Sequence, residues 1–206
     1  MQIQMFSKLK HTSILLSVNI FEKKNKVLLS ETEKGMSRIT LGRLSKELKR
    51  WKEDHPVGFY ANPKTETDGR TNMLLWEFGF AGKVGTPWEG GLYKGEIILK
   101  DYPFNPPIVK FVSDLFHPNL WPNGTMDLHI IMGDQWRPVV TIKEILLSVH
   151  ELLHNPKMKD PSHAEAYLCL LNDKATFDQK VRDQAHSMKA DWLSELSHCF
   201  LGVTSD

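Results

Sequence analysis

The residues His150-Glu151-Leu152-Leu153-His154 match a sequence pattern found in zinc peptidases. In that pattern two imidazoles lie one helical turn apart and bind zinc, and the glutamate activates a water molecule. Two observations argue against a metal here. The helix is expected to end directly after His154, and no third ligand follows at a recognised spacing. We therefore expect no metal site but two partly exposed histidines beside an apolar stripe, and a zinc metallopeptidase is a remote alternative.

The thiols are few, since Cys169 and Cys199 are the only cysteines in 206 residues. Two cysteines are too few for a disulfide framework, and neither lies in a cluster with metal-ligand spacing. This usage favours a reducing, intracellular compartment. No apolar stretch approaches the roughly 18 residues of a membrane span, so we expect a soluble protein without membrane contact.

Composition and charge limit the class of protein. A chain of this length with 41% hydrophobic residues predicts one globular domain with a sizeable core. The formal net charge of +1 is uneven: residues 1–35 carry six lysines and three glutamates, which leaves 20 basic and 22 acidic residues in 36–206. We expect no nucleic-acid partner, because no overall basic field would attract one.

Residues 1–35 differ in composition and spacing from the segment that follows them. Residues 1–35 contain a short apolar run, broken by Ser17 and Asn19, that lacks the length and cleavage site of a signal peptide, so a poorly ordered extension is expected. From Ser37 onward, apolar residues recur at helical spacing and basic residues take the other faces. This pattern predicts an amphipathic helix that ends at His55-Pro56 and carries the stripe Leu41, Leu44, Leu48 and Trp51.

Extended segments separated by turn signals follow this helix and predict an antiparallel meander. A fourth short strand is expected after a proline-rich turn at 102–107. In chain order the signals are the Asp68-Gly69 turn inside 63–71, the segment Leu74 to Phe80, the turn Gly82 to Gly85, the segment Gly91 to Leu99, and the short strand Ile108 to Val112.

Helices are expected again after the strands. Residues 141–144 (Thr-Ile-Lys-Glu) form a capping box that opens a helix to about His154. Asp160-Pro161 predicts a further helix start, with the acid as N-cap and the proline at the first helical position. The last helix is expected to carry the apolar stripe Phe177, Val181, Met188, Trp192 and Leu196. One sheet with helices at both ends predicts an α+β fold.

Five motifs in a fixed order carry a resemblance to a known family. They are Gly85-Thr86-Pro87-Trp88-Glu89-Gly90-Gly91, Tyr102-Pro103 with Pro106-Pro107, Phe116-His117-Pro118-Asn119, Trp136-Arg137-Pro138, and Asp160-Pro161. With the order of elements, they resemble the ubiquitin-conjugating enzyme superfamily, and within it the SUMO-conjugating enzymes most closely. The resemblance implies a UBC core domain over 36–191, with a four-stranded antiparallel meander, an N-terminal helix and C-terminal helices. Residues 1–35 and a tail at 192–206 lie outside it.

The resemblance also implies site residues. Asn119 matches the asparagine proposed to hydrogen-bond a developing oxyanion, and Asp160 matches the acid that positions and deprotonates the incoming lysine. A loop-holding residue and a plain helix cap are the respective alternatives. Trp121, Asn123 and Thr125 match positions that contact the acceptor lysine and its motif, and they could equally form a turn.

The first helix matches a docking surface of the superfamily. Lys49, Lys52 and His55 remain from the patch used for SUMO or another ubiquitin-like modifier, for the activating enzyme and for ligases. A solvated basic helix face is the alternative. The resemblance implies no cofactor.

Asp127 departs from the family pattern, since it stands eight residues after Asn119, where the superfamily holds the cysteine that carries the thioester. A thiolate forms a thioester that survives in water and still yields to a lysine amine. A carboxylate is a weaker nucleophile, and its mixed anhydride would hydrolyse quickly. The sequence therefore predicts a protein that cannot form the thioester.

Two readings of function follow from this departure. The chain is either a pseudo-conjugating enzyme that acts as a binding scaffold in SUMO or ubiquitin-like pathways, or an active SUMO-conjugating enzyme. Retained Asn119, Thr125, Trp136 and Asp160 favour the second reading. The resemblance and the low number of cysteines imply a location in the nucleus and cytoplasm.

Overall fold

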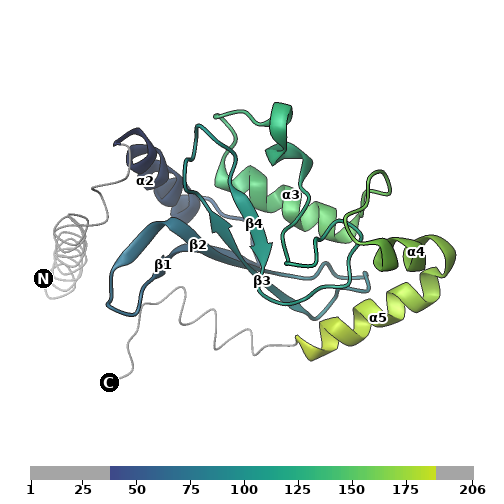
Figure 1. Cartoon of the computed structure of the whole chain (residues 1–206). Coiled ribbons are helices and arrows are strands. Elements are labelled where there is room, and N and C mark those ends of the chain that lie inside the picture. Colours follow the sequence, from purple (N-terminus) through teal and green to yellow (C-terminus); the bar gives the residue numbers. More distant parts are fainter. Residues whose placement is uncertain (1–37, 189–206) are drawn as a thin grey trace, which may run out of the picture.

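A computed structural model gives the fold of residues 38–188 (Figure 1). The expectations for the extension at 1–35, for Trp192, Leu196 and Cys199, and for the tail at 192–206 lie outside these residues. The elements in chain order are α2 (Arg38–Glu53), β1 (Phe59–Thr65), β2 (Thr71–Ala81), β3 (Leu92–Ile98), β4 (Ile108–Phe111), the short 3-10 turns η2 (His129–Ile131) and η3 (Gly133–Gln135), α3 (Ile142–His154), α4 (Ala164–Asn172) and α5 (Lys174–Ser187).

The four strands form one antiparallel sheet in the order β1-β2-β3-β4, which confirms the predicted meander and the α+β class. The first strand lies at Phe59–Thr65, before the Asp68-Gly69 turn, and the register with β2 shifts between Pro63 and Lys64. Side chains alternate between a buried and a more exposed face, as a one-sided sheet requires. In β4, for example, Val109 and Phe111 are buried, whereas Ile108 and Lys110 are exposed.

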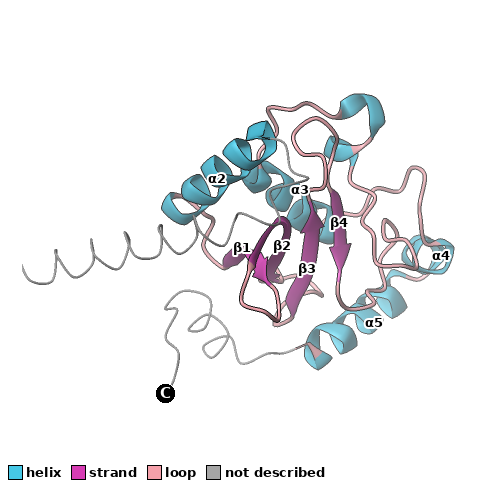
Figure 2. Cartoon of the chain, turned by 60° about the vertical axis from the view of Figure 1, so that its left-hand side comes forward, coloured by secondary structure: helices cyan, strands magenta, loops and turns pink. Residues whose placement is uncertain are grey.

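Helix α3 covers the buried face of the sheet, while α2 lies at one end of the molecule and α4 with α5 at the other (Figures 1 and 2). The predicted capping box is present, because the Thr141 hydroxyl and the Glu144 carboxylate each accept from the other residue's backbone N–H. The helix buries the whole stripe that its sequence predicts, namely Ile142, Ile145, Leu146, Val149, Leu152 and Leu153.

Glycine at position 95 allows the sheet to pack closely. A Cβ atom built on Gly95 would lie 2.4 Å from the ring of Phe78 and 2.5 Å from the Lys110 carbonyl. The vacant space lets Phe78 stack on Phe80 and meet Phe111 edge to face, with centroids 5.9 Å and 5.7 Å apart. The centre of the core is therefore aromatic.

Helix α2 has the predicted amphipathic character, with Leu44 and Trp51 buried and Leu41 and Leu48 packed against the core. Every helix within 38–188 is too short or too polar to cross a bilayer. Helix α5 ends at Ser187, and Met188 is its C-cap.

Candidate functional site

The segment from Asn119 to Asp127 folds back on itself as a tight hairpin. The Trp121 N–H donates to the Thr125 carbonyl at 2.9 Å, and the Asp127 N–H donates to the Asn119 carbonyl at 2.9 Å. Gly124 has a φ of +82°, a conformation that glycine adopts without steric cost, and it allows the chain to reverse here. The two ends of the hairpin, Asn119 and Asp127, are therefore held side by side.

Three residues expected to contact an acceptor lysine lie in this hairpin. The Asn123 side chain accepts from the Thr125 N–H at 3.0 Å, which is an Asx-type turn. Trp121 presents 51% of its surface to solvent. Asn123 thus forms the turn, while the exposed indole of Trp121 offers an apolar surface beside it.

His117 anchors the start of the hairpin to helix α3. It is fully buried; its Nδ1 accepts from the Asn119 N–H at 3.0 Å, and its Nε2 lies 3.1 Å from the Leu152 carbonyl. Since Nδ1 is an acceptor, the proton resides on Nε2, which donates to Leu152. Burial lowers the pKa of His117 to about 4, so the ring is neutral near pH 7.

The Asn119 side chain joins the hairpin to the loop that precedes α4. Its Nδ2 donates to the Lys157 carbonyl at 2.9 Å, and its Oδ1 accepts from the Lys157 N–H at 2.8 Å. Asn119 is 2% exposed, and this paired contact is the geometry of a loop-holding residue. The amide oxygen and one amide hydrogen are both engaged by Lys157 in this structure.

Asp127 lies at the other end of the hairpin, where its carboxylate accepts a hydrogen bond from the Ser162 hydroxyl at 3.0 Å. Both residues are half-buried. Ser162 is held in place by its own N–H, which donates to the Pro118 carbonyl at 2.8 Å. The structure thus gathers Asn119, Asp127 and Ser162 in one site, and the sequence analysis did not identify Ser162.

The expectation that Asp160 caps helix α4 is wrong. The helix begins at Ala164, and its N-cap is His163, whose Nδ1 accepts from the Ala166 N–H at 3.1 Å. The Pro118 carbonyl accepts from both the Ser162 and His163 N–H groups, so neither N–H group is part of the helix, which begins at Ala164. Asp160 has a φ of +56° and is exposed, at the surface of the same loop.

Of the three predicted docking residues, Lys49 and Lys52 lie on α2 and His55 follows the helix. Helix α2 and helix α4 lie at different ends of the molecule (Figure 1). Lys49 and Lys52 are exposed, and the Lys49 ammonium lies 3.9 Å from Glu53. The His55 ring stacks on Trp51, with centroids 5.7 Å apart. The structure does not bring these residues together with the hairpin, so any role in docking is separate from the hairpin site.

Two loops, which contain Phe104 and Val139, form a second surface, and a partly buried network of hydrogen bonds joins them to α2. Arg43 donates to Glu47 at 2.7 Å, to the Tyr102 hydroxyl at 2.9 Å, and to the carbonyls of Pro138, Val139 and Val140 at 2.9 to 3.3 Å. The Trp136 indole N–H joins the same two loops by donating to the Pro103 carbonyl at 3.0 Å.

Phe104 and Val139 project from these two loops with 57% and 74% of their surfaces exposed. We call them the Phe104–Val139 surface. Exposed apolar side chains on a rigid support are typical of a protein-binding surface. The i,i+4 spacing of Arg43 and Glu47 is visible in the sequence, but the burial of Glu47 and its link to two distant loops are not.

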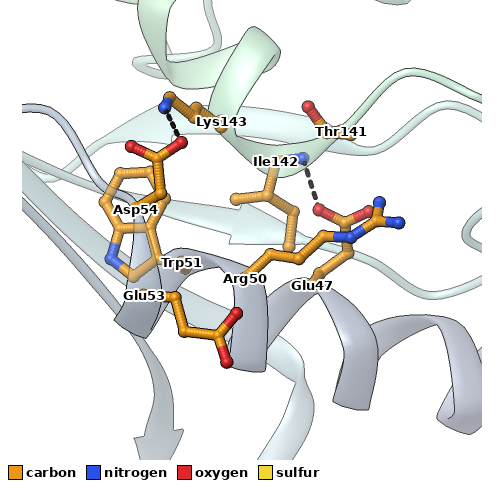
Figure 3. A pocket seen from close by; sticks show the side chains of 8 residues that line it. All are labelled: Glu47, Arg50, Trp51, Glu53, Asp54, Thr141, Ile142 and Lys143. Carbon is orange, nitrogen blue, oxygen red and sulfur yellow. Dashed lines mark hydrogen bonds and ion pairs between the residues drawn. The ribbon is translucent and has the colours of Figure 1, made fainter.

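A small pocket of about 190 Å³ lies between α2 and the first turn of α3 (Figure 3). Its carboxylates are largely engaged: Asp54 pairs with Lys143 at 2.7 Å, and Glu47 accepts from the Ile142 N–H at 3.1 Å. The pocket belongs to the contact between two helices and not to the hairpin. The residues that line it are Glu47, Arg50, Trp51, Glu53, Asp54, Thr141, Ile142 and Lys143.

The two histidines with zinc-peptidase spacing make contacts of a different kind. His154 Nε2 accepts from the Lys83 N–H at 2.8 Å, and Nδ1 lies 2.6 Å from the His150 carbonyl, so both ring nitrogens bind backbone groups. The His150 ring packs on Phe59 and Phe80 at 5.1 Å. Desolvation lowers the pKa of His154 to about 4. Within residues 38–188, no three metal-ligating side chains cluster.

Comparisons with known proteins agree with the geometry of the fold. The model of the family described as ubiquitin-conjugating enzyme matches residues 43–185. A Caenorhabditis elegans protein named SUMO-conjugating enzyme UBC9 is 40% identical over 162 residues, which cover 78% of this chain and 98% of the relative. A Dictyostelium discoideum protein named Sumo-conjugating enzyme ubc9 is 44% identical over 154 residues, which cover 73% and 96%.

Proposed function

The chain belongs to the ubiquitin-conjugating enzyme family. We propose that this family member cannot form the thioester and that it acts as a binding scaffold in a SUMO or related modifier pathway. The observation that carries the proposal is Asp127 at the end of the hairpin, where the family resemblance places the cysteine. The Asp127 carboxylate accepts a hydrogen bond from the Ser162 hydroxyl at 3.0 Å. Such a carboxylate cannot store an activated acyl group in water as a thiolate can.

The remaining thiols offer no replacement for the nucleophile. Cys169 is half-buried on α4, and its sulfur faces the Asp173 carbonyl at 3.9 Å. Cys199 follows the described residues by more than ten positions. Neither cysteine belongs to the hairpin that ends at Asp127.

The partners proposed for the scaffold are a SUMO-type modifier, its activating enzyme and ligases, since two similar proteins are named as SUMO-conjugating enzymes. Two surfaces support a binding role. The first is the Phe104–Val139 surface, and the second is formed by the exposed Lys49 and Lys52 of α2 together with the half-buried His55, which follows the helix. We propose nucleus and cytoplasm as the location, where such partners act.

The test of the proposal is a charging assay. The chain is incubated with activating enzyme, ATP and SUMO or ubiquitin, and products are separated on a gel without reductant. We expect no adduct that a thiol reagent cleaves. Asp127→Cys in a Cys169→Ser, Cys199→Ser background is expected to become charged, whereas Asp114→Cys, an exposed loop position, is expected to stay uncharged.

An active SUMO-conjugating enzyme is the second candidate. The observation that favours it is 40–44% identity over 96–98% of two proteins with that name. It predicts a thiol-sensitive adduct on the unaltered chain, and such an adduct would overturn the scaffold proposal. If Asp127→Cys also stays uncharged and the chain binds neither modifier nor activating enzyme, the scaffold proposal fails too.

A further inference from the structure

Ser162 and Asp127 form a hydroxyl–carboxylate pair at the place where the family resemblance puts the nucleophile. The Ser162 Oγ donates to the Asp127 Oδ2 at 3.0 Å. A serine hydroxyl is a weak nucleophile by itself, and an adjacent base that accepts its proton activates it. The pair therefore supplies a nucleophile and a base, two of the groups that transfer of an acyl group to oxygen uses.

Two consecutive residues hold the members of the pair, one residue for each member. Pro118 accepts from the Ser162 N–H at 2.8 Å and from the His163 N–H at 3.0 Å. Asn119, the next residue, accepts through its carbonyl from the Asp127 N–H at 2.9 Å. The pairing is thus a property of the folded backbone on both sides, and the side chains need no rearrangement to meet.

We propose that Ser162 is an acyl acceptor that forms an oxygen ester with the C-terminal carbonyl of a ubiquitin-like modifier. The modifier arrives as a thioester, and its C–S bond breaks as the Ser162 O–C bond forms. The Asp127 carboxylate takes the hydroxyl proton and then gives it to the departing thiolate. No oxidant or reductant takes part, and the thioester supplies the driving force.

The ester would keep the modifier covalently attached to this chain. An ester yields to amines more slowly than a thioester does, so the modifier would stay attached and would not pass readily to a lysine. This inference rests on the proposed function, because the chain must meet an activated modifier. It differs from that function in its chemistry, since the expected adduct resists thiol reagents and is cleaved by hydroxylamine or alkali.

The test uses the full chain with two acyl donors, the charged activating enzyme and SUMO prepared as a C-terminal thioester of a small thiol. The second donor removes any need for docking to the activating enzyme. We expect an adduct that resists thiol reagents, is cleaved by hydroxylamine, and maps by mass spectrometry to Ser162. Ser162→Ala should reduce this adduct at least tenfold, and Asp127→Asn should slow its formation roughly 100-fold.

Controls separate loss of the nucleophile from loss of the fold. Ser148→Ala, at a half-buried serine on α3, should leave the adduct unchanged. The Ser162→Cys variant should form a thioester adduct, which thiol reagents cleave. If neither donor gives a hydroxylamine-sensitive adduct, or if the adduct maps elsewhere and survives in Ser162→Ala, the inference is overturned. The scaffold proposal is judged separately, by direct binding of modifier and activating enzyme in the absence of ATP.

Discussion

Acid should weaken the fold through His117, the buried ring that holds the hairpin to α3. Its pKa is about 4 in the folded chain against 6.5 for the free side chain, and burial is the main cause. The folded pKa is depressed, so this ring's contribution to stability is complete above pH 6.5 and is lost as the pH falls toward 4. Each unit of pKa difference corresponds to about 1.4 kcal/mol, so the loss is about 2 kcal/mol at pH 5 and about 3 kcal/mol at pH 4.

The measurement is the free energy of unfolding in urea, followed by tryptophan fluorescence between pH 7.5 and pH 5. His117→Gln retains an amide donor and acceptor but does not titrate. We expect this variant to be less stable than the unaltered chain at pH 7.5, because the smaller side chain packs less well. Between pH 7.5 and pH 5, its free energy of unfolding should fall by about 2 kcal/mol less than that of the unaltered chain does.

A matched histidine on the surface provides the control. His186→Gln, at an exposed position on α5, should keep the pH dependence of the unaltered chain. If His117→Gln loses as much free energy of unfolding between pH 7.5 and pH 5 as the unaltered chain does, the buried neutral ring is not the group that titrates. The reasoning from burial to stability would then be refuted.

Two further predictions concern the Arg43 network and the surface that it supports. Glu47→Gln should lower the free energy of unfolding by roughly 1–3 kcal/mol, because the single amide oxygen cannot replace both carboxylate oxygens, which accept from Arg43 and from the Ile142 N–H, and because the charge beside Arg43 is lost. Exposed Glu53→Gln is the control, and equal effects of the two variants in urea denaturation would contradict the argument. Val139→Asp should weaken binding of a ligase partner at least tenfold by calorimetry, whereas Val84→Asp, at a valine 80% exposed on another loop, should not. Equal affinity of the two variants would show that the Phe104–Val139 surface binds no such partner.

Local patterns predicted most of the fold. The apolar stripe of α3 and its Thr141 capping box are short-range features, and the structure confirms both. The meander followed from turn residues and alternation. Asp160 failed as a helix cap because a distant carbonyl, that of Pro118, binds the N–H groups of Ser162 and His163. No short-range pattern contains that contact.

The candidate site was predicted only in part for the same reason. The spacing of Asn119 and Asp127 could be read from the sequence through the family resemblance, and the hairpin places them side by side. The bond between Asp127 and Ser162 joins residues 35 positions apart and depends on how the loop before α4 returns. The burial of Glu47 likewise depends on where α3 begins.

The single guanidinium of Arg43 has a consequence for recognition beyond stability. Its bonds to Tyr102, Pro138, Val139 and Val140 fix two loops before any partner arrives. Association normally loses free energy when mobile loops become ordered, at about 0.5–1.5 kcal/mol for each side chain immobilised. A preorganised pair of loops avoids much of that loss, so a small apolar contact can suffice for the binding that we propose at the Phe104–Val139 surface.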